Sequence, residues 1–256
     1  MVDNLEKLRI DALLVQRGFF ESRERAQRAL MAGQVFVAGQ RVDKAGTRVA
    51  VDAGIEVTAA EKYVSRGGLK LEGALDVFGV DPAGKVCLDI GASTGGFTDC
   101  LLQRGALRVH ALDVGHSQMH WKIRSDDRVL EQEGINCRNL TLADIGERVA
   151  LAVMDVSFIS LTLILPPAFE LLEPEGVMIA LIKPQFELSR SEVGKGGIVS
   201  DPALHEAAVE KIRRFVTEGL GRAWGGVIES PIRGANGNVE FLDFKKPLRI
   251  LLNRKN

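Results

Sequence analysis

The feature that most constrains the fold is a regular alternation of short apolar runs and helical segments beyond residue 85. The runs have the length of buried strands, and they lie at Val86-Ile90, Val109-Asp113, Leu151-Asp155, Val177-Ile182, Val227-Glu229 and Val239-Phe244. Helical periodicity appears between several of them, at Phe97-Arg104 and Ala203-Gly219. Because strands that alternate with helices pair in parallel through crossovers, the pattern predicts an α/β fold with a doubly wound, largely parallel sheet.

The first of these strands runs into a glycine-rich turn, Asp89-Ile-Gly-Ala-Ser-Thr-Gly-Gly-Phe-Thr-Asp99. Ligands of open α/β sheets bind outside the carboxyl ends of the strands, where glycines let the backbone approach them closely. The turn lacks the G-x-G-x-x-G spacing of dinucleotide sites, and Asp89 suits a cofactor with a cationic amino-acid group. We therefore expect S-adenosylmethionine. The candidate cofactor-binding residues are Asp89, Gly91, Ala92, Ser93, Thr94, Gly95, Gly96 and Phe97.

Asp113 ends the second strand and is placed to accept hydrogen bonds from ribose hydroxyls of this cofactor. The same acid would serve NAD, so it does not discriminate between the two. His116 and His120 are four residues apart but lack the glutamate of a zinc peptidase helix. No metal site is expected.

Four polar residues, at Lys70, Asp155, Lys183 and Glu240, define the acceptor side. Asp155 and Lys183 each end an apolar strand, and an unpaired carboxylate at Glu240 would be costly to bury in its strand. A ribose hydroxyl is a weak nucleophile, so its attack on a sulfonium methyl group profits from fixed geometry and an orienting or basic group. Lys183 could accept the proton or position the oxygen, while the two acids hold the lysines. The four residues are therefore the candidate catalytic set.

The segment from Arg9 to Val57 has a different organisation. It shows two short helix patterns that stop at Gly18 and Gly33, followed by short strands between glycine turns. This predicts a small α+β domain at residues 1–60, a linker at about 58–66, and the α/β domain at 67–256. Several arginines of the segment form either a solvated helix face, balanced by acids, or a surface that follows RNA phosphates. They are Arg17, Arg23, Arg25, Arg28 and Arg41.

Four stretches of this segment resemble the S-four-type RNA-binding domain. They are Arg9-Ile-Asp-Ala-Leu-Leu-Val, Ser22-Arg-Glu-Arg-Ala-Gln, Ala32-Gly-Gln-Val-Phe-Val-Ala-Gly and Ile55-Glu-Val. The resemblance implies that the five arginines bind RNA.

Nearly the whole chain resembles the TlyA or hemolysin A family of ribosomal RNA ribose methyltransferases. The motifs are Tyr63-Val-Ser-Arg-Gly-Gly-Leu-Lys70-Leu, the glycine turn, Asp155-Val-Ser-Phe-Ile-Ser, Leu181-Ile-Lys-Pro-Gln-Phe-Glu187 and Gly237-Asn-Val-Glu240-Phe-Leu. The resemblance implies a Rossmann-like, FtsJ-like methyltransferase domain that uses S-adenosylmethionine, with Lys70, Asp155, Lys183 and Glu240 as its catalytic tetrad. It implies ribosomal RNA or ribosomal subunits as the partner, and Asn139 as a contact of the cofactor's adenine.

Two other functions remain open, a membrane-active hemolysin-like protein and a catalytically silent RNA-binding factor. The apolar runs fall short of the roughly 20 residues that cross a bilayer, so no membrane partner is expected. Met1 to Arg9 alternates acidic and basic groups, which disfavours a signal peptide, and the three cysteines are not in paired spacings. We expect a cytoplasmic protein with buried, reduced thiols and no obligate protein partner.

Overall fold

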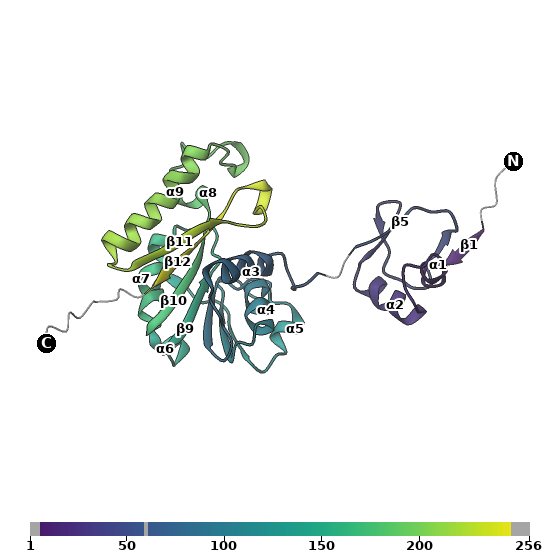
Figure 1. Cartoon of the computed structure of the whole chain (residues 1–256), viewed down its shortest axis with the longest axis horizontal. Coiled ribbons are helices and arrows are strands. Elements are labelled where there is room, and N and C mark those ends of the chain that lie inside the picture. The colour runs from purple at the N-terminus through teal and green to yellow at the C-terminus, as the bar shows by residue number, and fades with distance from the viewer. Residues whose placement is uncertain (1–5, 59–60, 247–256) are drawn as a thin grey trace. The chain divides into compact units, whose positions relative to one another are not determined.

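The computed structural model describes residues 6–58 and 61–246. The chain divides into two compact units, Met1–Glu61 and Lys62–Asn256 (Figure 1). Residues 62–66, which the sequence pattern assigned to the linker, belong to the second unit. Tyr63 is buried there, and the Val64 amide donates a 2.9 Å hydrogen bond to Asp99 Oδ2. The predicted linker therefore extended too far toward the carboxyl terminus.

The first unit is a small α+β fold around one apolar cluster. Its elements are β1 (Lys7–Arg9), α1 (Ile10–Gln16), α2 (Arg23–Met31), β2 (Val35–Val37), β3 (Gln40–Arg41), β4 (Arg48–Ala50) and β5 (Ile55–Val57). Strands β1 and β4 pair antiparallel, and β3-β2-β5 form a second antiparallel sheet. Ser22 caps α2 by accepting a 3.3 Å hydrogen bond from the Arg25 amide. The buried faces of α1 and α2 pack together through Leu13, Leu14 and Leu30.

The second unit is built on a seven-stranded sheet in the order β11-β12-β10-β9-β6-β7-β8. The strands are β6 (Val86–Ile90), β7 (Arg108–Leu112), β8 (Val129–Gln132), β9 (Val149–Met154), β10 (Leu172–Ile182), β11 (Ala223–Glu229) and β12 (Phe241–Lys246). Pairing is parallel from β10 through β8, and only β11 and β12 run antiparallel to their neighbours. The predicted doubly wound, largely parallel sheet is confirmed. The pattern missed β8, an edge strand with mixed polarity.

Helices cover both faces of this sheet (Figure 1). They are α3 (Gly67–Phe78), α4 (Gly96–Gln103), α5 (Trp121–Arg124), α6 (Leu142–Ile145), α7 (Leu165–Glu170), α8 (Pro184–Glu187) and α9 (Pro202–Arg214). Side chains alternate along each strand, so Cys87 of β6 joins the cluster under α3 and α4, whereas Leu88 joins the cluster under α6, α7 and α9. Cys87, Cys100 and Cys137 are buried free thiols, as predicted.

Candidate active site

The carboxyl ends of β6, β7 and β9 meet at one edge of the sheet, because these strands are parallel. At this edge the backbone of the glycine turn packs against the backbone at the end of β9. Gly91 has a φ of +84°, and a Cβ at this position would lie 2.6 Å from the Asp155 carbonyl oxygen. Only glycine fits this approach without moving the backbone of β9. The turn therefore sits directly against the strand end that carries Asp155.

A cavity of about 530 Å³ opens at this edge. We call it the crevice pocket. Its lining includes three of the predicted cofactor-binding residues, Gly91, Ser93 and Asp113, together with Asp155 of the predicted tetrad. Asp113 directly follows the carboxyl end of β7, and two backbone amides hold its carboxylate in place. Oδ2 accepts a 2.8 Å hydrogen bond from the Ser93 amide, and Oδ1 accepts a 2.7 Å hydrogen bond from the Gly115 amide.

The other residues of the glycine turn lie around the pocket and are not part of its lining. Thr94 is exposed, while the remaining ones are buried and form the support of the turn: Ala92, Gly95, Gly96 and Phe97. Asn139 is exposed and lies outside the lining, whereas its neighbours Asn136, Cys137 and Arg138 contribute to it. The pocket lining therefore comes from the residues around the start of the short 3-10 turn η1 (Cys137–Asn139), and the contact of Asn139 with the adenine stays a prediction.

Asp89 lies beneath the turn with no exposed surface. Its Oδ2 accepts a 2.6 Å hydrogen bond from Thr98 Oγ1 of α4, and its Oδ1 has no hydrogen-bond partner among the described residues. Burial raises the pKa of Asp89 to about 7. A buried, half-satisfied carboxylate under a glycine turn is costly, and such costs concentrate at functional sites.

The four residues of the predicted tetrad come together in space as an alternating chain of charges. Lys70 Nζ lies 2.6 Å from Glu240 Oε2 and 3.9 Å from Asp155 Oδ2. Lys183 Nζ lies 2.6 Å from Asp155 Oδ1. Lys70, Lys183 and Glu240 are buried, and the Asp155 side chain keeps 21% of its surface exposed, toward the crevice pocket that it lines. Each buried charge thus has an opposite charge beside it, which offsets its desolvation.

The sheet topology explains how residues so far apart in sequence meet. Asp155 follows β9 and Lys183 follows the parallel strand β10. Strand β12 runs antiparallel to β10 and pairs Phe241 with Ile182, so Glu240 arrives beside Lys183 from the opposite chain direction. Lys70 reaches the same point from α3. Gly234 packs directly on the Glu240 carboxylate, and a side chain there would collide with it.

Two further residues of the site lie in the motif Asp155-Val-Ser-Phe-Ile-Ser but were not among the candidate site residues. Ser157 Oγ accepts a 2.8 Å hydrogen bond from Lys183 Nζ. Phe158 is 89% exposed, has a φ of +63°, and packs its ring 5.1 Å from that of Phe186. A bulky residue in the left-handed region is a strained outlier that marks functional sites. Periodicity cannot reveal either residue, since both lie in a loop.

The predicted RNA-binding arginines of the first unit divide into two groups. Three are engaged within the unit: Arg17 with the Val51 and Ala53 carbonyls, Arg23 with the buried Asp11 at 2.8 Å, and Arg25 with Glu21 at 2.6 Å. Arg28 and Arg41 are exposed and form no ion pair within residues 6–58.

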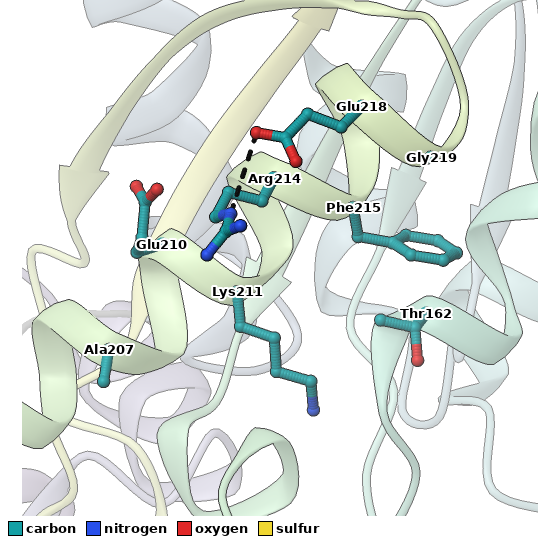
Figure 2. Close-up of a pocket in the computed structure, with 8 residues that line it drawn as sticks. All are labelled: Thr162, Ala207, Glu210, Lys211, Arg214, Phe215, Glu218 and Gly219. Carbon is teal, nitrogen blue, oxygen red and sulfur yellow. Dashed lines mark ion pairs between the residues drawn. The ribbon is translucent and has the colours of Figure 1, made fainter.

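A second cavity, of about 630 Å³, lies along α9 and the π-helical turn η4 (Phe215–Gly219) that follows it. Figure 2 shows its lining, with Arg214 and Glu218 joined by a 3.7 Å ion pair. It shares no residue with the crevice pocket or the tetrad. Over residues 6–58 and 61–246, no group of three or more His, Cys, Asp or Glu could hold a metal ion, and no helix is long and apolar enough to span a bilayer.

The class that this fold and crevice define is the Rossmann-type methyltransferases. Residues 63–246 match the FtsJ-like methyltransferase family, and residues 8–55 match the S4 domain. The chain belongs to the FtsJ-like methyltransferases and, within them, to the TlyA family, in which an S4 domain precedes the methyltransferase domain.

Named relatives cover almost all of the chain. It is 45% identical over 237 residues to the 16S/23S rRNA (cytidine-2'-O)-methyltransferase TlyA of Mycobacterium tuberculosis, covering 92% of this chain and 88% of the relative. It is 44% identical to Hemolysin A of Brachyspira hyodysenteriae, covering 92% and 98%. A solved structure from Streptococcus thermophilus is 43% identical, with a TM-score of 0.72 and coverage of 95% and 89%.

Proposed function

We propose that this protein transfers a methyl group from S-adenosylmethionine to the 2'-hydroxyl of a cytidine in ribosomal RNA. The observation that carries the proposal is the position of Asp155, which lines the crevice pocket and forms a 2.6 Å ion pair with the buried Lys183. A cofactor in the pocket and a hydroxyl at Lys183 would therefore be neighbours. Two relatives, at 45% and 37% identity, are named rRNA (cytidine-2'-O)-methyltransferases, which supports the ribose acceptor and the cytidine.

The residues of the pocket fit this cofactor. Asp113 keeps acceptor capacity for ribose hydroxyls beside its two backbone bonds. Gly91 brings the backbone of the turn to the pocket surface, whereas Asp89 is fully buried outside the lining and supports the turn from below. When bound, the cofactor supplies a methyl group on a sulfonium, which makes the carbon electrophilic.

The tetrad would orient the acceptor. Lys183 is held by Asp155 and Ser157, so its ammonium can donate a further hydrogen bond to the ribose oxygen in a fixed direction. Lys70, fixed by Glu240, places a second positive charge near the same carboxylate. The oxygen–carbon bond would form as the carbon–sulfur bond breaks, and the hydroxyl proton would pass to solvent at the exposed part of Asp155. S-adenosylhomocysteine is the product that departs.

Two features support an RNA substrate. Arg28 and Arg41 are exposed and form no ion pair within residues 6–58 of the S4 unit, and such guanidinium groups suit phosphate contacts. Phe158 offers an exposed aromatic face at the pocket rim, on which an unstacked base can stack. A target nucleotide turned out of its helix would place its base on Phe158 and its ribose toward Lys183.

The test is transfer of labelled methyl groups to purified ribosomal subunits and to naked ribosomal RNA, followed by nuclease digestion and mass analysis of nucleosides. Label in 2'-O-methylcytidine that disappears with Lys183→Ala would establish the reaction class and the acceptor. Cofactor binding without incorporation into any ribosomal substrate would overturn the proposal in favour of a silent RNA-binding factor.

A further inference from the structure

Two segments of the second unit run side by side through a series of contacts. We call residues 155–161 the acceptor loop, and it faces residues 183–187, which comprise Lys183 and α8. Lys183 contacts the loop through its ion pair with Asp155 and its hydrogen bond to Ser157. The rings of Phe158 and Phe186 lie 5.1 Å apart. Each of these contacts is made at or near the crevice pocket.

Glu187 makes the last contact in the series, away from the pocket. It is 4% exposed. Its Oε2 accepts a 2.6 Å hydrogen bond from Ser160 Oγ, and its Oε1 accepts a 2.7 Å bond from the Leu161 amide. Lys211 of α9 lies 3.2 Å from Oε2 and also donates to the Glu187 carbonyl oxygen. Both carboxylate oxygens therefore bind the loop, and Oε2 also binds α9.

We propose that Glu187 is a positioning residue for methyl transfer, because it anchors the far end of the acceptor loop. The inference rests on the proposed function, since the loop carries Asp155, Ser157 and Phe158. A strained backbone such as that of Phe158 persists only where its surroundings fix it from several sides. The near end of the loop is fixed by the end of β9, and Glu187 fixes the other end through a side-chain and a backbone bond.

The alternative is that Glu187 serves stability alone, by giving Lys211 a partner and joining α8 to α9. A positioning role depends on the two bonds from Glu187 to the acceptor loop, whereas a purely stabilising role depends on its ion pair with Lys211. Glu187→Gln keeps an oxygen for the Leu161 amide and an amide group for Ser160 Oγ, but it removes the negative charge that faces Lys211. Glu187→Ala removes both loop bonds. Lys211→Met is the matched control, because it removes the tie to α9 and leaves the loop bonds in place.

The experiment measures kcat and KM for RNA, and the Kd for S-adenosylhomocysteine, in these three variants. Assays run well below each variant's unfolding temperature, with rates normalised to the sites that bind S-adenosylhomocysteine. We expect Glu187→Ala to lower kcat about tenfold or more, since small misplacements of reacting groups have large effects, with Kd within about threefold. Glu187→Gln and Lys211→Met should stay within about threefold of wild-type kcat.

Three results would overturn the inference. One is wild-type kcat in Glu187→Ala, another is equal losses in Glu187→Ala and Lys211→Met, and the third is a folded Glu187→Gln as slow as the alanine variant. Should Glu187→Ala not fold, Ser160→Ala removes one loop bond without exposing a new charge. It should lower kcat by about threefold or more, and an unchanged rate would then reject the inference. Wild-type enzyme that transfers no methyl group would instead reject the proposed function.

Discussion

Lys70 and Glu240 are 170 positions apart in the sequence, yet Lys70 Nζ lies 2.6 Å from Glu240 Oε2 in a buried ion pair. The pair joins α3, which precedes the first strand of the large sheet, to the segment that leads into β12. It therefore ties together the two ends of the methyltransferase fold while it holds one lysine of the tetrad in place.

Glu240→Ala should destabilise the second unit, because it leaves the Lys70 ammonium buried with a carboxylate no nearer than 3.9 Å. Loss of one partner of a buried pair typically costs about 3–5 kcal/mol. Urea denaturation followed by far-UV circular dichroism measures the effect. Lys70→Met combined with Glu240→Gln is the control and should recover part of the loss. An unchanged midpoint in Glu240→Ala would contradict the paired geometry.

Lys183→Ala should abolish methyl transfer while the Kd for S-adenosylhomocysteine stays within about threefold, because Lys183 lies on the acceptor side of the crevice. Isothermal titration and the labelled-methyl assay separate the two effects. Lys85→Ala, at the opposite end of β6, is the matched control and should be fully active. Parallel loss of cofactor binding would show that Lys183 acts on the pocket instead.

Arg28→Glu combined with Arg41→Glu should weaken RNA binding and reduce its salt dependence, since both guanidinium groups are exposed and free for phosphates within the described S4 unit. Filter binding over a range of salt concentrations measures both quantities. Arg23→Glu serves as a contrast. It removes a partner of the buried Asp11 and should lower the unit's thermal stability as well. Unchanged RNA affinity in the double variant would remove these arginines from the interface.

Asp89 should make stability fall with rising pH. Burial raises its pKa to about 7, whereas the unfolded carboxyl titrates at about 3.9, so the folded state binds more protons between these values. Stability is then lost progressively from about pH 4 to pH 7. Asp89→Asn keeps an oxygen for Thr98 Oγ1 and should not show this loss. Parallel curves of unfolding free energy against pH for the two proteins would refute the raised pKa.

Phe158→Gly should be at least as stable as the wild type, because the ring is exposed and glycine adopts a φ of +63° without strain. The same variant should bind its RNA target less tightly, as base stacking on an aromatic ring contributes about 1–3 kcal/mol. Thermal unfolding and the KM for RNA test the two halves. Phe19→Gly, an exposed phenylalanine in the first unit, controls for loss of any apolar surface.

The sheet and the tetrad could be predicted from the sequence, whereas the contacts made by the loops could not. Asp155 and Lys183 each follow an apolar strand, and the carboxyl ends of parallel strands lie at the same edge of a sheet. The sequence pattern therefore predicted that these two residues lie close together. The Ser157 and Glu187 contacts depend on how two irregular segments pack, and no periodicity encodes that. Asn139 was expected from motif resemblance, and its contact with the adenine stays a prediction. The neighbouring Asn136 lines the pocket, which the sequence alone did not indicate. Strand β8 was not predicted, because it lies at the sheet edge and its partly exposed side chains give no apolar run.

The order of strands has a consequence for the protein's synthesis. Strand β12 is inserted between β10 and β11, so the sheet closes only after residues 241–246 have been made. Glu240 arrives together with that strand. A nascent chain that has emerged only as far as β11 therefore holds three of the four tetrad residues, with the Lys70 ammonium still lacking its closest counter-ion. If the proposed function holds, the complete tetrad therefore forms only when the strand that completes the sheet delivers the last acid.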